Sequence, residues 1–276
     1  MSSLPQVRVL PSADEVARAA AEEIVRVLGD AIRDRGVAHW ATTGGSAAPP
    51  VYRHLGEPPL REALDWGRVH VWWGDDRFVP TDHPLSNVLP LEQILLDSGG
   101  DESDNGTTGS DVGEAGLGVH IPAGNLHPIP MSLAIGRGTG VVGAAAAYAI
   151  ELAALVPAGA DGLPSFDLVW LGVGPDGHVL SVFPGSAVWD AGTNVAPVPA
   201  PTHVEPHVER VTIHPRLLAA AGEVLVVTTG ASKAANLGLA WSGDDARELP
   251  LRAARLPNAV WLLDDAAAAD LTLPDR

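Results

Sequence analysis

Cysteine is absent from the 276-residue chain. This absence excludes disulfide bonds, thiolate nucleophiles and zinc or iron–sulfur sites built on cysteine. Cationic side chains are scarce as well, since 17 lysine and arginine residues stand against 34 aspartate and glutamate residues and give a formal net charge of -17. Such a field repels polyanions, and the cations are scattered singly rather than gathered in a basic stripe. We therefore expect no nucleic-acid partner.

No apolar run is long enough to cross a bilayer. The closest approach, VVGAAAAYAIELAALV, is alanine-rich, shorter than a span and interrupted by Glu151, and it predicts a buried helix instead. The N-terminal residues MSSLPQVRVL lack the charged and apolar regions of a signal peptide. The chain is 46% hydrophobic and 18% charged, a composition typical of globular proteins. We expect a cytoplasmic protein that has no membrane partner.

Short β-prone runs alternate with helical patterns along most of the chain. Apolar residues at helical spacing predict a helix from Ala13 to Arg33, and the apolar run from Val37 to Thr43 predicts a strand after it. RVHVWWG, FDLVWLG, EVLVVTTG and NAVWLLD predict further strands, and Ala144 to Leu155 and Ser232 to Trp241 predict helices. This alternation predicts an α/β fold in which helices cover both faces of a mainly parallel sheet.

Glycine and polar residues gather where the predicted strands end, in TTGGS, GDDR, GVGPDGH and TTGASK. Ligands of parallel sheets bind beyond the carboxyl ends of the strands, so we expect the site among these loops. No linker divides the chain, and we predict one domain over residues 1–276. The stretch from Asp97 to Gly116 is rich in serine, glycine and aspartate and predicts a flexible surface insertion.

The segment FDLVWLGVGPDGHVLSVFPGS permits two interpretations. Gly172, Gly174 and Gly177 spell G-x-G-x-x-G directly after an apolar run, which is typical of a dinucleotide-binding turn. A dinucleotide fold needs a long helix after the third glycine, but Pro184 and Gly185 would end a helix there after about two turns. The pattern therefore argues against a nicotinamide cofactor.

In the second interpretation, the glycines let the backbone turn sharply and approach a ligand closely. Asp176 and His178 then project from one rigid turn, two residues apart. The carboxylate can fix the orientation of the imidazole, which can act as a base near neutral pH. The alternative without a function is a helix-capping aspartate beside a surface histidine.

The segment TTGGSAAPP places Gly44, Gly45 and Ser46 between a predicted strand and a short predicted helix. Free amides at a helix N-terminus bind anions, and the glycine pair lets a phosphate come close. The Walker pattern is absent, so we expect no nucleoside triphosphate. An ordinary strand-to-helix turn is the structural alternative.

Two further loops supply charged side chains, Asp75 and Arg77 in WWGDDRFVP and Lys233 in TTGASK. The planar guanidinium of arginine suits a phosphate, although a local Asp-Arg pair and a solvated lysine are the structural alternatives. Because four such signals stand at four strand ends, we favour one small anionic ligand. His203 and His207 have the spacing of a metal pair, but the prolines of PTHVEPHVE prevent a helix, so we expect a loop without a metal.

These motifs resemble those of the 6-phosphogluconolactonases. LGVGPDGHVLSVFPGS is similar to the family signature L-G-x-G-x-D-G-H-x-A-S-L-F-P-G. Further segments follow in the family's order and cover nearly the whole chain: GGS at 44–46, WWGDDRFVPTDHPLSN at 72–87, IPAGNLHPI at 121–129, ERVTIHPRLLAAA at 209–221, GASKAANL at 230–237 and WLLDDAAA at 261–268.

The chain departs from the family pattern in three places. Asp76 replaces the usual glutamate, Val179-Leu180 replaces Thr-Ala, and Ala47-Ala48 replaces Thr-Pro. The first change leaves the neighbouring arginine intact. The last change removes a hydroxyl group that can help to bind phosphate.

The resemblance implies a three-layer α/β/α fold with a mainly parallel, Rossmann-like sheet, of the type shared with glucosamine-6-phosphate deaminases and ribose-5-phosphate isomerases. It also implies hydrolysis of 6-phospho-D-glucono-1,5-lactone to 6-phospho-D-gluconate in the oxidative pentose phosphate pathway, without a cofactor. With the motifs, it makes His178 the expected general base and Asp176 its partner. The expected substrate- or phosphate-binding residues are Gly44, Gly45, Ser46, Asp75, Arg77, Gly174, Gly177, Arg210 and Lys233.

Two other functions stay open at this point. A glucosamine-6-phosphate deaminase-like enzyme would share the Asp-Gly-His turn, but that branch has a glutamate five residues after the histidine, where this chain has Phe183. A non-catalytic sugar-phosphate sensor would use the same fold, but no DNA-binding helix pair or basic arm is visible. We expect a monomer or a weak homodimer.

Overall fold

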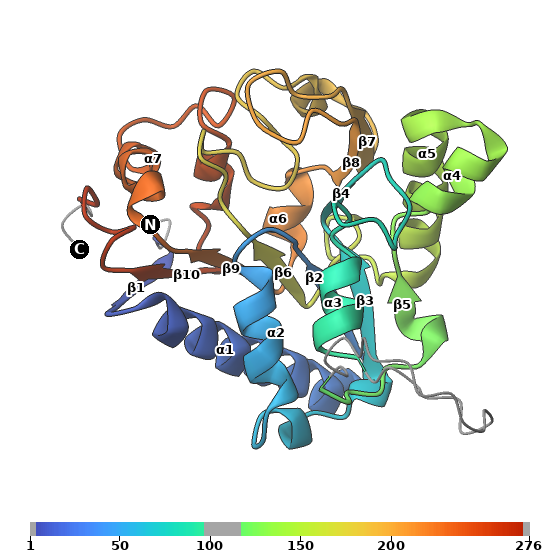
Figure 1. Ribbon diagram of the computed structural model, residues 1–276, viewed down its shortest axis with the longest axis horizontal. Helices are drawn as coiled ribbons and strands as arrows, with labels where there is room; N and C mark the ends of the chain where they lie inside the picture. The colour runs from blue at the N-terminus through green and yellow to red at the C-terminus, as the bar shows by residue number, and fades with distance from the viewer. Residues whose placement is uncertain (1–3, 97–116, 273–276) are drawn as a thin grey trace, which may run out of the picture.

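A mainly parallel sheet runs through the computed structural model, which describes residues 4–96 and 117–272. Within these residues, seven strands follow the order β1-β10-β9-β6-β2-β3-β5, and all neighbours in the sheet are parallel (Figure 1). The strands are β1 (Gln6–Leu10), β2 (Ala38–Thr42), β3 (Val69–Trp73), β5 (Leu126–His127), β6 (Leu168–Leu171), β9 (Glu223–Thr228) and β10 (Ala259–Asp264). The predicted insertion at 97–116 lies outside the described residues.

Helices cover both faces of this sheet (Figure 1). One face carries α1 (Ala13–Arg35), α2 (Ala48–Gly56) and α3 (Leu89–Ile94), and the other carries α4 (Met131–Arg137), α5 (Gly140–Leu155), α6 (Arg216–Ala220) and α7 (Ala234–Ala240). Short 3₁₀ helices cover Arg61–Ala63, Trp66–Arg68, Ala123–Asn125, Ala187–Asp190, Ala231–Lys233 and Pro250–Ala254. This arrangement confirms the predicted three-layer α/β/α fold.

Aromatic side chains fill both interfaces between sheet and helices. On one face, Tyr52 of α2 lies edge-on to Trp40 and Trp170, with ring centroids 6.3 and 5.8 Å away. On the other face, Trp72 lies 6.0 Å from Tyr148 of α5. Successive residues of a strand point to opposite faces, so strands covered in this way are apolar throughout. This packing explains why β2, β6 and β10 are buried along their whole length.

Local capping sets the ends of α1, which runs two residues beyond the predicted Ala13 to Arg33. The helix begins after Ser12, whose hydroxyl oxygen accepts a hydrogen bond from the backbone N–H of Glu15 at 3.2 Å. It ends at Gly36, whose φ of 79° lies in the left-handed region. A serine N-cap and a left-handed glycine are common helix boundaries.

The alanine-rich run that predicts a buried helix forms α5, but only one side of this helix is buried. Tyr148 and Leu152 are fully buried, whereas Val142 and Ile150 are 66% and 73% exposed. The expectation of a buried helix therefore holds for one face only, because α5 covers the sheet from outside instead of passing through the core. Among the described residues, no helix is long and apolar enough to cross a membrane.

The order of the strands decides which loops meet. From β2 the chain passes through α2 to β3 on one side, and from β6 it passes through α6 to β9 on the other side. Because β2 and β6 are neighbours, their carboxyl ends point the same way while their loops diverge, which opens a crevice. The predicted Gly-Gly-Ser turn at 44–46 and the histidine turn at 172–178 both lie at this point.

A second, antiparallel sheet extends from β3 and has the order β4-β8-β7 within the described residues. Its strands are β4 (Asp75–Arg77), β7 (Val195–Val198) and β8 (Arg210–Ile213). The sequence patterns did not predict this sheet. Its register places Arg77 directly opposite Arg210, so two cations predicted for the site lie side by side.

A cluster of histidines lies on the α5 face, away from the crevice. The His39 and His70 rings stack with centroids 5.0 Å apart, and His70 Nδ1 lies 2.9 Å from His127 Nε2. The Trp72 indole N–H donates to His39 Nδ1 at 3.2 Å, so this nitrogen is an acceptor and His39 is neutral. Burial, together with the charges of His70, His127 and Arg35, lowers the pKa of His39 from 6.5 to about 4.

This cluster predicts a loss of stability in acid. The unfolded chain binds a proton at His39 below about pH 6.5, whereas the folded protein does so only near pH 4. The free energy of unfolding should therefore decrease as the pH is lowered from 6.5 to 4. The slope should reach at most about 1.4 kcal/mol per pH unit from this residue. Urea unfolding at pH 7.5, 6.0 and 5.0 measures it.

The variant His39→Gln keeps an acceptor for Trp72 but cannot titrate, so its stability should fall less steeply in acid than that of the wild type. His120→Gln, which changes an exposed histidine, is the matched control and should behave like the wild type. Equal slopes for His39→Gln and the wild type would show that the cluster does not set the acid sensitivity.

Candidate active site

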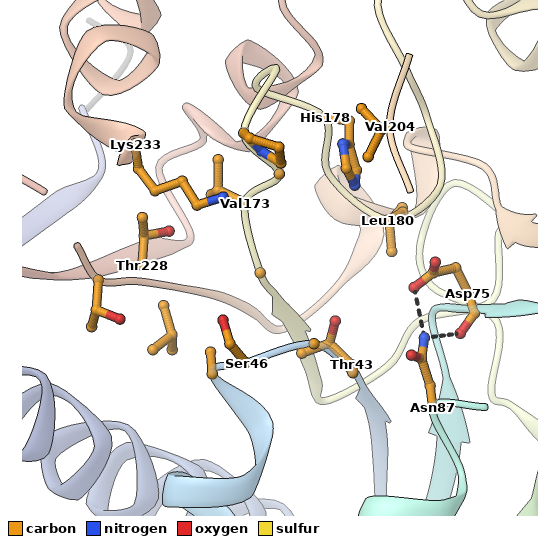
Figure 2. A pocket seen from close by; sticks show the side chains of 18 of the residues that line it. Thr43, Ser46, Asp75, Asn87, Val173, His178, Leu180, Val204, Thr228 and Lys233 are labelled. Carbon is orange, nitrogen blue, oxygen red and sulfur yellow. Dashed lines mark hydrogen bonds between the residues drawn. The ribbon is translucent and has the colours of Figure 1, made fainter. Parts of the chain in front are cut away.

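A pocket opens at the crevice between β2 and β6 (Figure 2). Figure 2 shows His178 and Lys233 reaching into it from one side, with Thr43 and Ser46 across from them. The predicted site residues that line it are Gly44, Gly45, Ser46, Asp75, Arg77, Gly174, His178, Arg210 and Lys233. The structure therefore gathers residues from five separate segments of the chain. Asp176 and Gly177 stand next to His178 in the chain, outside the lining.

Asp176 and His178 form a close pair. Asp176 Oδ1 lies 2.5 Å from His178 Nδ1 and also accepts from the backbone N–H of His178 at 3.2 Å. Because an ionised carboxylate only accepts hydrogen bonds, Nδ1 carries the proton and Nε2 is the basic nitrogen. The two side chains are only 13% and 18% exposed. This is the geometry of an oriented general base.

The glycines of this turn make room for the histidine. A Cβ at Gly174 would lie 2.0 Å from His178 Nδ1, so any larger residue would displace the ring. Gly177 has a φ of +79°, and a Cβ there would lie 2.2 Å from Leu249 Cδ1. Residues 177–186 form turns and a short bridge with no helix. The dinucleotide interpretation is therefore wrong, and the turn presents a histidine.

The positive charges of Arg77 and Arg210 have no carboxylate partner within 4 Å among the described residues. Arg77 instead donates to the Leu85 carbonyl at 2.8 Å and to Asn87 Oδ1 at 3.0 Å. The Nε atoms of both arginines are buried without a partner in the described part of the chain. Like charges opposite each other across strands repel, and a buried donor without a partner is costly. An anion in the pocket would relieve the repulsion between the two charges.

Arg210 is almost completely buried, with 2% of its surface exposed. It donates to the Pro206 carbonyl at 3.2 Å, and its guanidinium lies 5.2 Å from the centroid of the Phe183 ring. Burial lowers the pKa of Arg210, Asp75 acts in the opposite direction, and the charge of Arg77 lowers it again. Apart from the family motif, no sequence pattern pointed to this residue.

Asp75 is held by neutral groups and not by the arginine two residues away. Ser181 donates to its Oδ2 at 2.5 Å. The Asn87 side-chain amide donates to the backbone carbonyl oxygen of Asp75 at 2.9 Å (Figure 2). The local Asp-Arg pair considered from the sequence is therefore not formed. A carboxylate fixed in this way at the pocket wall can accept hydrogen bonds from sugar hydroxyl groups.

Asp76 points away from the pocket and organises the loop behind it. Its carboxylate accepts hydrogen bonds from the backbone N–H groups of Arg77 and Asn87, each at 2.8 Å, and from the Ser86 hydroxyl at 2.9 Å. Burial raises the pKa of Asp76 to about 7, although these hydrogen bonds act in the opposite direction. Asp76, which replaces the glutamate of the family pattern, therefore stabilises the loop and does not line the pocket.

The N-terminus of α2 borders the pocket beside Gly44, Gly45 and Ser46. Its N-cap residue, Ala47, provides no side-chain hydrogen bond. Pro49 and Pro50 in its first turn have no N–H, and the N–H of Ala48 already donates to the Gly45 carbonyl at 3.4 Å. The helix therefore contributes its dipole, which favours negative charge at this end, and any free amides that face an anion come from the turn at 44–46.

Lys233 is the only lysine in the chain. It lies just before α7 and lines the pocket, and no carboxylate lies within 4 Å of its amino group among the described residues. Burial lowers its pKa, and the charge of Asp176 acts in the opposite direction.

Other polar residues of the pocket were missed by the sequence analysis. Asn87 ends the segment WWGDDRFVPTDHPLSN, and Thr228 belongs to the TTG run before Lys233, so both lay inside quoted motifs. The hydroxyl of Thr228 is buried without a partner in the described residues. Glu205 comes from the loop that carries His203 and His207, and a metal pair was the only role considered for that loop.

The predicted absence of a helix around His203 and His207 is confirmed, since residues 199–209 form a loop. The two histidines have different partners: His203 Nε2 lies 2.9 Å from Asp176 Oδ2, and His207 Nδ1 lies 2.7 Å from the Pro201 carbonyl oxygen. In the described residues, no group of three or more histidine and acidic side chains is arranged to hold a metal ion.

Comparison with known proteins shows which family the chain belongs to. The family model described as "Glucosamine-6-phosphate isomerases/6-phosphogluconolactonase" matches residues 11–262. The chain belongs to this family. The 6-phosphogluconolactonase of Streptomyces coelicolor is 36% identical over 98% of this chain and 96% of its own length. That of Mycobacterium tuberculosis is 31% identical over 96% of this chain and 98% of its own length.

A solved structure supports the same relationship. The 6-phosphogluconolactonase from Trypanosoma cruzi aligns with a TM-score of 0.80 and 26% identity, and the match covers 99% of both chains. The resemblance to the 6-phosphogluconolactonases that the motifs indicated is thereby confirmed, over nearly the full length of the protein.

Leu180 stands where the 6-phosphogluconolactonase signature has alanine, and the structure shows what this departure does. Its φ of 56° lies in the left-handed region, which is uncommon for a residue with a side chain. Leu180 lines the pocket beside His178. A Cβ at Gly74 would lie 2.7 Å from Leu180 Cδ2, so the glycine makes room for it. The leucine narrows the pocket relative to an alanine.

The position of Lys233 predicts selective chemical modification. Pyridoxal 5′-phosphate followed by borohydride reduction labels amines, and Lys233 should be the only side chain that it labels. The lowered pKa of Lys233 increases the fraction of its amino group that is unprotonated, and the pocket attracts the phosphate of the reagent. Labelling should be about ten- to a hundredfold faster than with pyridoxal, the factor that a charge-assisted contact gives. Peptide mapping by mass spectrometry identifies the site.

Excess inorganic phosphate should protect Lys233, and Lys233→Arg should show no side-chain adduct. The N-terminal amine provides an internal control, since its labelling should not respond to inorganic phosphate. Equal rates with the two reagents, together with no protection, would contradict an anion site at this lysine.

Proposed function

We propose that this protein hydrolyses 6-phospho-D-glucono-1,5-lactone to 6-phospho-D-gluconate, the lactone-opening step of the oxidative pentose phosphate pathway. The observation that carries this proposal is the Asp176–His178 pair at the wall of a pocket that also holds Arg77, Arg210 and Lys233. A base beside unpaired cations suits a phosphorylated substrate that is attacked by water. Relatives with 31–36% identity over nearly the whole chain bear the name of this activity.

His178 is the proposed general base. Its Nε2 takes a proton from a water molecule while the water oxygen forms a bond to C1 of the lactone. When the bond between C1 and the ring oxygen breaks, the imidazolium returns the proton to that oxygen, and the new carboxylic acid ionises. Asp176 holds the ring in position and stabilises the imidazolium, as a triad carboxylate does.

The remaining site residues are proposed to bind the substrate. The turn at 44–46, with Arg77 and Lys233, would hold the 6-phosphate, and the dipole of α2 would favour its negative charge. Arg210 adds a buried positive charge, and Asp75 would accept hydrogen bonds from sugar hydroxyl groups. Gly174 and Gly177 keep the histidine turn close to the substrate. No step of this reaction requires a cofactor or a metal ion.

The deaminase-like alternative is not favoured. At the position of the glutamate of that branch, Phe183 packs against His178 with ring centroids 4.6 Å apart, so an aromatic ring occupies the place of the carboxylate. A sensor would not need the oriented pair of Asp176 and His178. The cytoplasmic location and the monomeric or weakly dimeric state stay predictions.

Replacement of the base tests the mechanism. His178→Asn should lower kcat by roughly 10² to 10⁴, the usual effect of removing a positioned base, with KM nearly unchanged. Asp176→Asn should give a smaller loss of the same kind.

Acid release from the lactone, measured above its spontaneous hydrolysis, and ammonia release from glucosamine 6-phosphate distinguish the alternatives. A deaminase would release ammonia, and a sensor would bind both compounds without turnover. A His178→Asn enzyme with wild-type kcat would remove this residue from the mechanism and leave Asp176 as the base to test.

Recognition of the phosphate gives a separate prediction. Arg77→Ala and Lys233→Ala should each raise KM by about ten- to a hundredfold, because a charge-assisted contact to an anion contributes about 1.5 to 3 kcal/mol. Arg137→Ala, which changes an exposed arginine of α4, is the control and should leave KM unchanged. Efficient hydrolysis of unphosphorylated gluconolactone by the wild type would refute the phosphate assignment.

A further inference from the structure

The loop at 199–209 brings a second histidine to the catalytic pair. Its residues Val204 and Glu205 line the pocket, and Figure 2 shows Val204 beside His178. The preceding residue, His203, points to the far side of the turn and reaches Asp176. The loop therefore contacts the site in two ways, as a wall of the pocket and through the carboxylate behind the base.

Asp176 is shared between the two histidines. Its Oδ1 lies 2.5 Å from Nδ1 of His178, and its Oδ2 lies 2.9 Å from Nε2 of His203. Since both carboxylate oxygens accept, each imidazole must present an N–H to it. Burial raises the pKa of Asp176, but the hydrogen bonds from His178 and His203 outweigh this effect and hold the pKa below its usual value.

An aromatic contact holds His203 at this position. The ring of Phe183 lies 4.6 Å from that of His178 and 5.6 Å from that of His203, with the second contact edge-on at 81°. Phe183 is buried, so it gives a fixed surface between the two imidazoles. His203 itself is 51% exposed, so packing alone does not explain its orientation.

We propose that His203 is a positioning residue of the hydrolytic site, which acts by fixing Asp176 and by withdrawing negative charge from the oxygen that faces His178. This inference rests on the proposed function. With one oxygen held by His203, the carboxylate cannot rotate freely, and the His178 ring keeps the tautomer with Nε2 as the base.

The same contact influences the basicity of His178. A carboxylate that loses one donor carries more negative charge toward its remaining partner, and it stabilises the imidazolium more strongly. Lys233 and Arg210 are the other charged groups that act on Asp176 or lie near it, and they remain when His203 is replaced. Removal of His203 should therefore make His178 easier to protonate.

The test compares His203→Ala with His203→Gln and with His207→Ala. His207 belongs to the same loop and is 48% exposed but has no contact with Asp176 in the described structure, so it is a matched control. His203→Ala should lower kcat by about two- to tenfold, the factor given by one hydrogen bond, with KM nearly unchanged. Glutamine can still donate to Asp176 and should restore most of the loss.

The pH profile separates positioning from a general structural effect. In His203→Ala the acid limb of kcat should move to higher pH by about half a unit to one unit, as expected for the loss of one hydrogen bond. An NMR titration of the His178 ring in the free protein should show the same upward shift. The His207→Ala profile should coincide with that of the wild type.

The outcomes also separate this inference from the proposed function. If the wild type does not hydrolyse the lactone, the proposed function fails, but the NMR titration of His178 still tests the contact through Asp176. If the wild type is active and His203→Ala keeps both its kcat and its acid limb, the inference about His203 is overturned alone. An equal loss of kcat in His203→Ala and His207→Ala would overturn it too, because the loop and not the contact would be responsible.

Discussion

The site depends on the parallel pairing of β2 with β6. The register places Trp40 beside Leu168, and it brings the two following loops so close that a Cβ at Gly172 would lie 4.0 Å from the Gly44 carbonyl oxygen. A shift of the register by one residue would turn the side chains of one strand to the other face. It would also separate the turn that carries His178 from the turn at 44–46. The core of the sheet and the chemistry of the pocket are therefore fixed by one interaction.

The pocket gathers positive charge, although the molecule as a whole is strongly negative. The chain carries a net charge of -17, yet its pocket gathers cations whose nearest carboxylates are engaged elsewhere. Asp75 is held by Ser181 and Asn87, and Asp76 is buried behind the loop. The acidic surface repels large polyanions, whereas a small anion that reaches the crevice meets positive charge at low dielectric, where attraction is strongest.

Sequence patterns predicted the features that depend only on residues close together in the chain. The helix from Ala13, the apolar strands and the glycine turns each have local signals, and the family motif identified Arg210. The contacts between distant segments had no such signal. The pairing of Arg77 with Arg210 arises from antiparallel β4 and β8, which are short and were not recognised. The bond from His203 to Asp176 joins residues 27 positions apart, and only the folded loop brings them together.

Leu180 shows how the width of the pocket and the stability of the fold depend on the same side chain. A side chain in the left-handed region costs roughly 1–2 kcal/mol, and the protein accepts this cost at a wall of its pocket. Glycine or asparagine would adopt the same backbone with less strain, but either would leave the space over Gly74 unfilled. Because Leu180 is only 6% exposed, the loss of its buried side chain costs about 2–5 kcal/mol, which is more than the strain that it relieves. A change at residue 180 that widens the pocket to admit a bulkier substrate should therefore lower the heat resistance of the protein as well.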